Sequence, residues 1–136
     1  MIFSDGGPFV SYFVSGDPNH RSVRDFFANN RQQISIASPV LAEVSHFLNR
    51  HRLIGAEVRF LRLLADGIFP VVDPILADYA RAADFVEEYA NFPLGTVDAL
   101  IAAMAERLKV TTLLTLDRRH FEAIRPSHCE RFELVP

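Results

Sequence analysis

Apolar residues recur along the chain with two different spacings. Short apolar or alternating stretches are typical of strands, and they occur at residues 1–4, 33–38, 68–72, 110–116 and 131–135. Between them, apolar residues recur every three or four positions, which predicts amphipathic helices at residues 17–30, 38–52, 56–67, 73–90, 96–108 and 118–125. Strands separated by helices favour an α/β fold whose parallel sheet is covered on both faces.

Capping residues and breakers set the expected ends of these helices. Asp17, Ser38 and Asp73 each directly precede a proline, which predicts that they cap the helices that follow them. Gly67 is expected to end the third helix, and residues 91–95, "NFPLG", read as a loop. With 136 residues, the chain is expected to form a single domain spanning residues 1–136.

Composition narrows the class of protein. Hydrophobic residues make up 49% of the chain, so a core can form without cross-links. The only cysteine, Cys129, allows no internal disulfide and no cysteine metal motif, which suits a reducing compartment. There is no secretory signal pattern, and no apolar run approaches the ~20 residues of a membrane helix. We therefore expect a soluble cytoplasmic protein that does not associate with membranes.

Four carboxylates occupy positions where an α/β fold gathers its functional groups. Asp5 ends the first predicted strand and Asp117 follows the strand at 110–116. Asp98 lies in the first turn of an alanine-rich helix, and Glu43 lies within the apolar helix at 38–52. Ligands of open α/β sheets bind outside the carboxyl ends of the strands, so these side chains are expected to meet there.

Each carboxylate also has a purely structural explanation. Asp98 could complement the helix dipole, and Asp117 could cap the short helix that follows it. Asp5 could begin a turn with the two glycines that come after it. Glu43 could face solvent on its helix, although its neighbours are largely apolar. Each explanation remains open for a single residue, and only the combination of four favours a common site.

A divalent cation would explain four carboxylates in one place. Like charges that share a pocket repel one another, and a cation removes this repulsion. Mg²⁺ and Mn²⁺ bind carboxylate and water oxygens, whereas the five histidines show no zinc-type spacing. Such an ion suits phosphoryl chemistry, because it can activate a water and stabilise charge on phosphate. A phosphoryl-transfer receiver is disfavoured, since the only lysine, Lys109, precedes its strand.

These residues also carry a resemblance to a known family. Asp5, "PVLAEV" with Glu43, "LGTVDALIAAMAERL" with Asp98 and "TLLTLDRRHF" with Asp117 follow one another in the order seen in PIN domains. The chain resembles in particular the VapC toxins of type II toxin–antitoxin systems, along nearly its whole length. The resemblance implies a three-layer α/β/α sandwich with a mostly parallel central sheet. It also implies Mg²⁺- or Mn²⁺-dependent endoribonuclease activity, a VapB-type antitoxin that blocks the site, and a homodimer.

The resemblance assigns roles to individual residues. Asp5, Glu43 and Asp98 would be the core metal-binding and catalytic acids, and Asp117 a fourth, more variable one. Thr115 would orient an acid or a water. Two positions depart from the family pattern: Gly6 replaces a hydroxyl residue after the first aspartate, and His120 stands where many relatives have aspartate. These departures keep a second hypothesis open, in which a weak or inert PIN-like module binds RNA or antitoxin without cutting.

Substrate and partner binding leave fainter traces in the sequence. RNA phosphates need cations, for which the candidates are Arg50 with Arg52 and Arg118 with Arg119; the second pair is favoured because it adjoins Asp117. A solvated helix face is the alternative explanation. The stretches "AEVRFLRLLADGIF" and "FFANN" carry many large apolar residues, which either fill the core or contact an antitoxin or second subunit.

Overall fold

A fully parallel sheet forms the centre of the molecule. The computed structural model describes residues 1–136, and its five strands lie in the order β3-β2-β1-β4-β5. The strands are β1 (Ile2–Ser4), β2 (Ile34–Ala37), β3 (Val71–Val72), β4 (Thr112–Leu114) and β5 (Glu133–Val135). Each neighbouring pair is parallel. The strand pattern in the sequence is confirmed, although every strand is shorter than the apolar stretch that predicted it.

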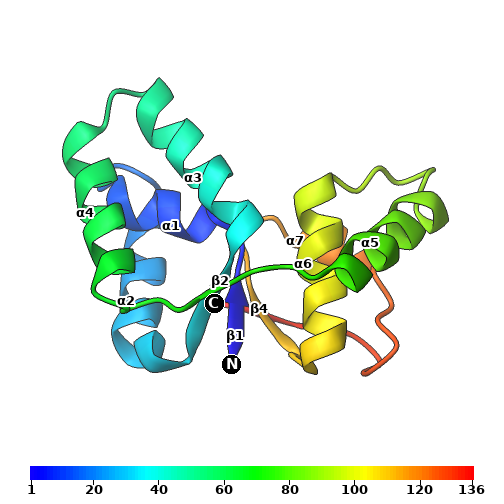
Figure 1. Ribbon diagram of the computed structural model, residues 1–136. Helices are drawn as coiled ribbons and strands as arrows, with labels where there is room; N and C mark the ends of the chain where they lie inside the picture. Colours follow the sequence, from blue (N-terminus) through cyan, green and yellow to red (C-terminus); the bar gives the residue numbers. More distant parts are fainter.

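Helices cover both faces of this sheet. They are α1 (Gly6–Phe13), α2 (His20–Asn30), α3 (Ser38–Arg50), α4 (Ile54–Ala65), α5 (Leu76–Glu88), α6 (Thr96–Leu108) and α7 (Arg118–Ala123), with a 3-10 turn at Arg31–Gln33. Figure 1 shows α1 to α4 on one side of the sheet and α5 to α7 on the other. The expected α/β/α sandwich is confirmed. None of the helices is long and apolar enough to cross a membrane.

The two helical layers fill the core in different ways. On the α1–α4 side, the rings of Phe9, Phe27 and Phe69 pack with centroids 5.1–5.4 Å apart. On the other side, α6 buries a run of seven consecutive residues, Ala99–Ala105, of which four are alanines. Small side chains let neighbouring elements approach the α6 backbone closely, and α6 packs most extensively against α5.

The predicted caps were wrong at three helices. Ser38 is the first residue of α3 instead of its cap, and Asp17 accepts from the backbone N–H of Asn19 before α2 begins. In α5 the N-cap is Ile75, and Asp73 lies before it. A cap followed by proline is a local pattern, and it located each helix start only to within two residues. The helix α1 was not predicted at all, because its two glycines and a proline resemble a turn.

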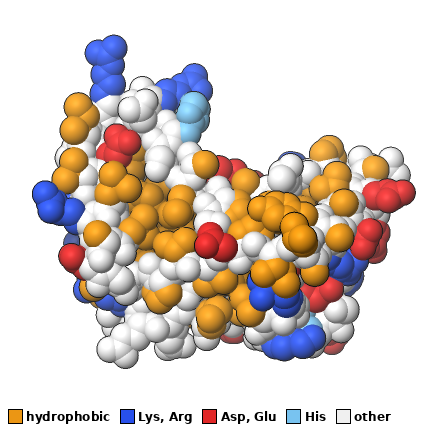
Figure 2. All heavy atoms as spheres, in the orientation of Figure 1, with side chains coloured by type: hydrophobic (Ala, Val, Ile, Leu, Met, Phe, Trp, Pro, Cys, Tyr) orange, Lys and Arg blue, Asp and Glu red, His pale blue; other side chains and the backbone are white.

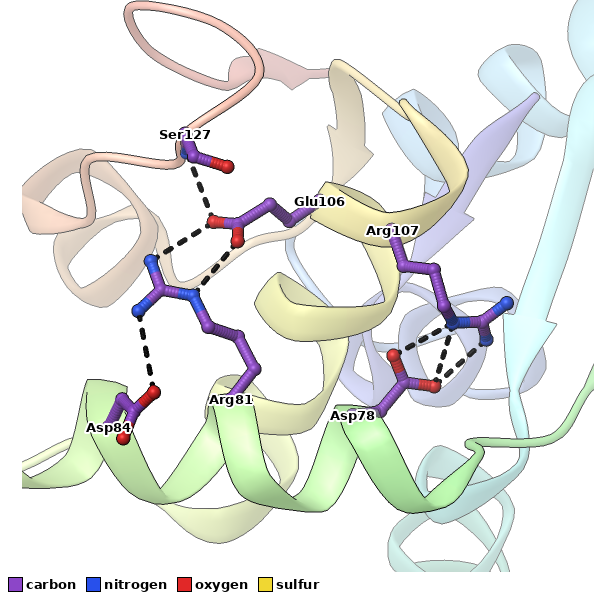
Figure 3. Close-up of polar contacts among 6 residues, drawn as sticks. All are labelled: Asp78, Arg81, Asp84, Glu106, Arg107 and Ser127. Atoms are coloured by element: carbon purple, nitrogen blue, oxygen red, sulfur yellow. Dashed lines mark hydrogen bonds and ion pairs between the residues drawn. The ribbon is translucent and has the colours of Figure 1, made fainter.

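An ion-pair network fastens α5 to α6 (Figure 3). Arg107 donates to both carboxylate oxygens of Asp78, at 2.8–3.1 Å. One turn along α5, Arg81 binds Glu106 in the same forked manner, at 2.8 and 3.2 Å. Glu106 also accepts from the backbone N–H of Ser127, at 3.0 Å. Forked arginine–carboxylate pairs fix orientation as well as distance, so α5 and α6 are held in one register.

Candidate active site

Parallel pairing of β1 with β4 places Asp5 beside Thr115. Ser4 pairs with Leu114 at the carboxyl ends of the two strands, and the backbone N–H of Asp5 donates to the Leu114 carbonyl at 2.9 Å. Thr115 Oγ1 donates to Asp5 Oδ2 at 3.1 Å, while Oδ1 accepts from the backbone N–H of Gly6 at 2.7 Å. Both oxygens of the Asp5 carboxylate are therefore held, and the same carboxylate caps α1.

Asp117, in the segment after β4, and Asp98, in α6, lie near the same edge of the sheet. The Thr115 hydroxyl also lies 3.2 Å from the Asp117 carbonyl oxygen. Asp117 occupies the N-cap position of α7, but its side chain makes no capping hydrogen bond, so the capping explanation for this residue is not supported. Asp98 lies in the first turn of α6, and its Oδ2 is 2.8 Å from Nδ1 of His120 in α7. This bond ties α6 to α7.

Glu43 approaches from the α1–α4 side. A Cβ atom added at Gly6 would lie 3.4 Å from Glu43 Oε2 and 3.6 Å from Val44. The Glu43 carboxylate therefore lies directly over the backbone of Gly6, next to Asp5. The face of α3 made by Val40, Val44 and Leu48 is buried, whereas Glu43 is exposed. Acidic side chains are visible at the base of the notch between the two helical layers (Figure 2).

The negative charges of these acids repel one another and raise their pKa values. Burial raises the pKa of Asp5, and the nearby charges of Asp98 and Asp117 raise it further, against the hydrogen bonds from Gly6 and Thr115. Burial, followed by repulsion from Asp5 and Asp98, raises the pKa of Glu43. Burial also raises the pKa of Asp98, although its bond to His120 opposes this. A shared negative field of this kind favours binding of a cation.

The donor set fits a hard divalent ion. Carboxylate oxygens are the ligands that Mg²⁺ and Mn²⁺ prefer, and no cysteine lies among them. As the structure stands, no three acidic, histidine or cysteine side chains are arranged closely enough to hold a metal ion together. The acids are therefore close enough for their charges to interact, and binding an ion would require them to move closer together.

Sequence reasoning missed how His120 and the arginines are used. His120 was noted only as a departure, yet it is the hydrogen-bond partner of Asp98. Arg118 donates to the Pro136 carbonyl oxygen at 2.7 Å, while Arg119 lies over the ring of Phe92. These arginines were predicted from the sequence because they adjoin Asp117, but no pattern in the sequence predicted that Phe92 would lie against Arg119.

Comparison with known proteins identifies the family. Residues 2–125 match the PIN domain. The chain belongs to the PIN-domain family. It is 31% identical over 132 residues to Ribonuclease VapC26 of Mycobacterium tuberculosis (strain ATCC 25618 / H37Rv), covering 97% of this chain and 98% of that relative. Ribonucleases of the PIN family depend on a divalent metal, which agrees with the chemistry of the carboxylate cluster.

Solved structures agree on the fold. The crystal structure of Mycobacterium tuberculosis VapC20, a sarcin-ricin loop cleaving toxin, matches with a TM-score of 0.80 at 18% identity, over 88% of this chain and 92% of that one. A toxin–antitoxin complex from Klebsiella pneumoniae matches with a TM-score of 0.72 at 20% identity, over 100% and 97%. The PIN-like architecture expected from the sequence is therefore confirmed.

Proposed function

We propose that this protein is the toxin of a type II toxin–antitoxin pair and cleaves RNA as an Mg²⁺- or Mn²⁺-dependent endoribonuclease. The observation that carries the proposal is the meeting of Asp5, Glu43, Asp98 and Asp117 at one sheet edge, in a chain related to VapC ribonucleases. Acids that raise one another's pKa at a carboxyl edge suit an ion and a phosphodiester better than any structural role.

Asp5, Glu43 and Asp98 are the residues that would hold the ion, with Asp117 as the fourth. A bound divalent ion supplies a more acidic water and stabilises negative charge on the phosphate. The surrounding residues keep the carboxylates in place: Thr115 donates to Asp5, and His120 binds Asp98. Positioning of this kind contributes to affinity because the carboxylates need not reorient when the ion binds.

Partner binding follows from the toxin assignment. A VapB-type antitoxin would cover the active site, and a second copy of the chain would complete a homodimer. Large exposed hydrophobic side chains support such contacts, and apart from Met1 all of them lie in α4, β3 and α5 or next to α5. They are Ile54, Val58, Leu61, Val71, Ile75, Leu76, Tyr79 and Val86. Part of this apolar surface faces the viewer in Figure 2. The proposed substrate places the protein in the cytoplasm.

The stretch "AEVRFLRLLADGIF" divides between the two explanations given for it. Phe60 and Phe69 are buried in the core, whereas Val58 and Leu61 are exposed. In "FFANN", Phe27 is buried and Phe26 is half-buried against the core. Core packing therefore explains the aromatic residues, and partner binding remains the explanation for the exposed aliphatic residues of α4.

The test is cleavage by the purified, antitoxin-free protein. Structured RNAs are incubated with Mg²⁺, with Mn²⁺ or with EDTA, and the same reactions are run with Asp98→Asn. We expect discrete fragments that require both the metal and Asp98. A folded protein that binds the ion and leaves RNA intact would favour an inert module instead. Gly6 and His120 support that second candidate, because both depart from the family pattern at the site.

A further inference from the structure

Phe92 lies one side chain away from a candidate metal ligand. Its ring meets the His120 ring edge to face, with centroids 5.4 Å apart and an interplanar angle of 79°. Nδ1 of the same His120 lies 2.8 Å from Asp98 Oδ2. The order Phe92, His120, Asp98 therefore runs from the loop before α6 into the carboxylate cluster. An aromatic ring is thus fixed at the margin of the proposed reaction centre.

This ring is not needed by the hydrophobic core. The chain has 12 phenylalanines; eight are buried in the core and three others pack against it. Phe92 alone belongs to neither group. It is half-buried, and the side chains that the aromatic contacts place against it are His120 and Arg119. Core packing therefore does not explain a large apolar ring at this position.

Arg119 adds an available positive charge above the ring. Its guanidinium carbon lies 5.5 Å from the Phe92 ring centroid. Arg119 is exposed and makes no ion pair with any acid, although Asp117 and Glu122 are near it in sequence. Its neighbour Arg118 is engaged by the Pro136 carbonyl oxygen. Arg119 is therefore free to contact a ligand without breaking an ion pair.

A flat ring and a free guanidinium beside a phosphate-cleaving centre match one class of ligand. Unpaired RNA bases stack on phenylalanine rings and on guanidinium planes, while the adjoining phosphates attract the positive charge. Bases inside a duplex are already stacked on their neighbours and cannot be inserted in this way. The ligand that fits is therefore an unstacked nucleotide of single-stranded RNA or of an RNA loop.

We propose that Phe92 and Arg119 form a base-stacking subsite that holds one unpaired nucleotide of the RNA beside the scissile phosphate. This subsite rests on the proposed function and adds a substrate preference to it. Phe92 supplies the stacking surface and Arg119 covers the base or contacts its phosphate. His120 is a positioning residue, because it touches both the ring and Asp98 and so fixes the distance between the subsite and the carboxylates.

The experiment measures binding apart from cleavage. All variants are made in the full chain carrying Asp5→Asn, which is expected to suppress cleavage, and are tested in Mg²⁺. The probes are a fluorescein-labelled single-stranded oligoribonucleotide, the same strand annealed to its complement, and an abasic strand of equal length. Fluorescence anisotropy gives the dissociation constants. Phe92→Leu removes the aromatic face, and Phe92→Tyr retains it.

Arg59 offers a matched control for Arg119. Its guanidinium carbon also lies 5.5 Å from a phenylalanine ring, that of Phe13, but on the α1–α4 side. Both arginines are exposed, so Arg119→Gln and Arg59→Gln each remove one surface charge above a ring. Thermal melting of every variant identifies any loss of folding.

We expect Phe92→Leu to weaken binding of the single strand by about 5- to 150-fold, the range for loss of one stacked base. Phe92→Tyr should bind as the parent does, and the abasic and duplex probes should be insensitive to Phe92→Leu. Arg119→Gln should weaken single-strand binding more than Arg59→Gln does. Equal binding by Phe92→Leu and its parent, or an equal loss on the abasic probe, would overturn the subsite; a peptide-binding role would produce the first result.

Failure of the subsite and failure of the nuclease proposal remain distinguishable. Cleavage by the chain without Asp5→Asn is followed in parallel, with Mg²⁺ or Mn²⁺. Cleavage together with an unaffected Phe92→Leu variant would reject the subsite and leave the nuclease proposal intact. Absence of cleavage together with a selective loss of single-strand binding would reject the nuclease proposal and leave Phe92 and Arg119 as a base-binding site without a scissile phosphate.

Discussion

Replacing Asp78 by alanine should test how firmly α5 is fastened to α6. The Asp78 side chain is only 2% exposed, and it has two roles. It accepts from Arg107 at 2.8–3.1 Å, and it accepts from the backbone N–H of Ile75 at 2.8 Å, which closes the first turn of α5. Burial by itself raises the pKa of Asp78, but the bonds from Arg107 and Ile75 outweigh burial and lower it. The charged form is therefore the one that the fold stabilises.

The expected loss can be worked from these contacts. A hydrogen-bonded charged pair contributes about 1.5–3 kcal/mol, and the lower half applies because Arg107 is 30% exposed and can rehydrate. The lost cap adds about 1 kcal/mol. Asp78→Ala should therefore lower the free energy of unfolding by about 2–4 kcal/mol. Asp78→Asn keeps an oxygen for the Ile75 N–H and should lose only about 1–2 kcal/mol.

Urea unfolding, followed by circular dichroism, gives the free energy of unfolding of both variants and the parent, and thermal unfolding gives their melting temperatures. For a chain of this length the alanine variant should melt roughly 6–16 °C lower. Asp84→Ala is the control, because Asp84 is 67% exposed and lies 4.0 Å from Arg81; its change should stay within about 0.5 kcal/mol. The reasoning fails if Asp78→Ala loses no more stability than Asp84→Ala, or if the alanine and asparagine variants are equally stable.

Three further predictions concern the carboxylate cluster. Burial, and then mutual repulsion, raises the pKa of Asp5 and Glu43 above their unfolded values, so without metal the folded state takes up protons before the unfolded state does as the pH falls from 7 towards about 4. Thermal melting in EDTA should therefore show that the protein becomes more stable over that pH range. Saturating Mg²⁺ at pH 7 should also raise the melting temperature. Asp98→Asn should abolish metal-dependent cleavage while keeping or raising apo stability, because it removes a buried charge; a large drop in melting temperature in EDTA would contradict this. Gly6→Ala should fold with a change within about 1 kcal/mol, since the added Cβ would meet Glu43 Oε2 at 3.4 Å and the φ angle is not positive; calorimetry of Mg²⁺ binding should then show whether Glu43 has been displaced.

Most helices and strands could be predicted from the sequence because the local sequence patterns agree with the packing of the whole fold. The helix at residues 96–108, predicted to follow the loop at 91–95, has both ends where they were predicted, and in the structure Lys109 ends it in a left-handed conformation. The strand at 110–116 was recognised from its β-branched and apolar residues, but only residues 112–114 pair within the sheet. The ends of elements depend on tertiary contacts that the sequence does not display.

The candidate site was readable in part for the same reason. Asp5, Glu43 and Asp98 were selected by their positions relative to strands and helices, and the register of β1 with β4 explains why Asp5 lies beside Thr115. By contrast, nothing local distinguishes Phe92 from the other phenylalanines, because its contacts with Arg119 and His120 depend on where α7 lies. A side-chain contact between elements that are distant in the sequence cannot be predicted from periodicity or capping patterns.

The strand order has a consequence for the way the protein is made. Because β4 pairs directly with β1, Thr115 and Asp117 join Asp5 only after the last third of the chain is available. The candidate reaction centre is drawn from residues 5, 43, 98 and 117, so a growing polypeptide lacks the complete set until residue 117 has been added. Chains truncated before β4 would lack both Thr115 and Asp117, and Asp5 would lose the hydroxyl that donates to its carboxylate.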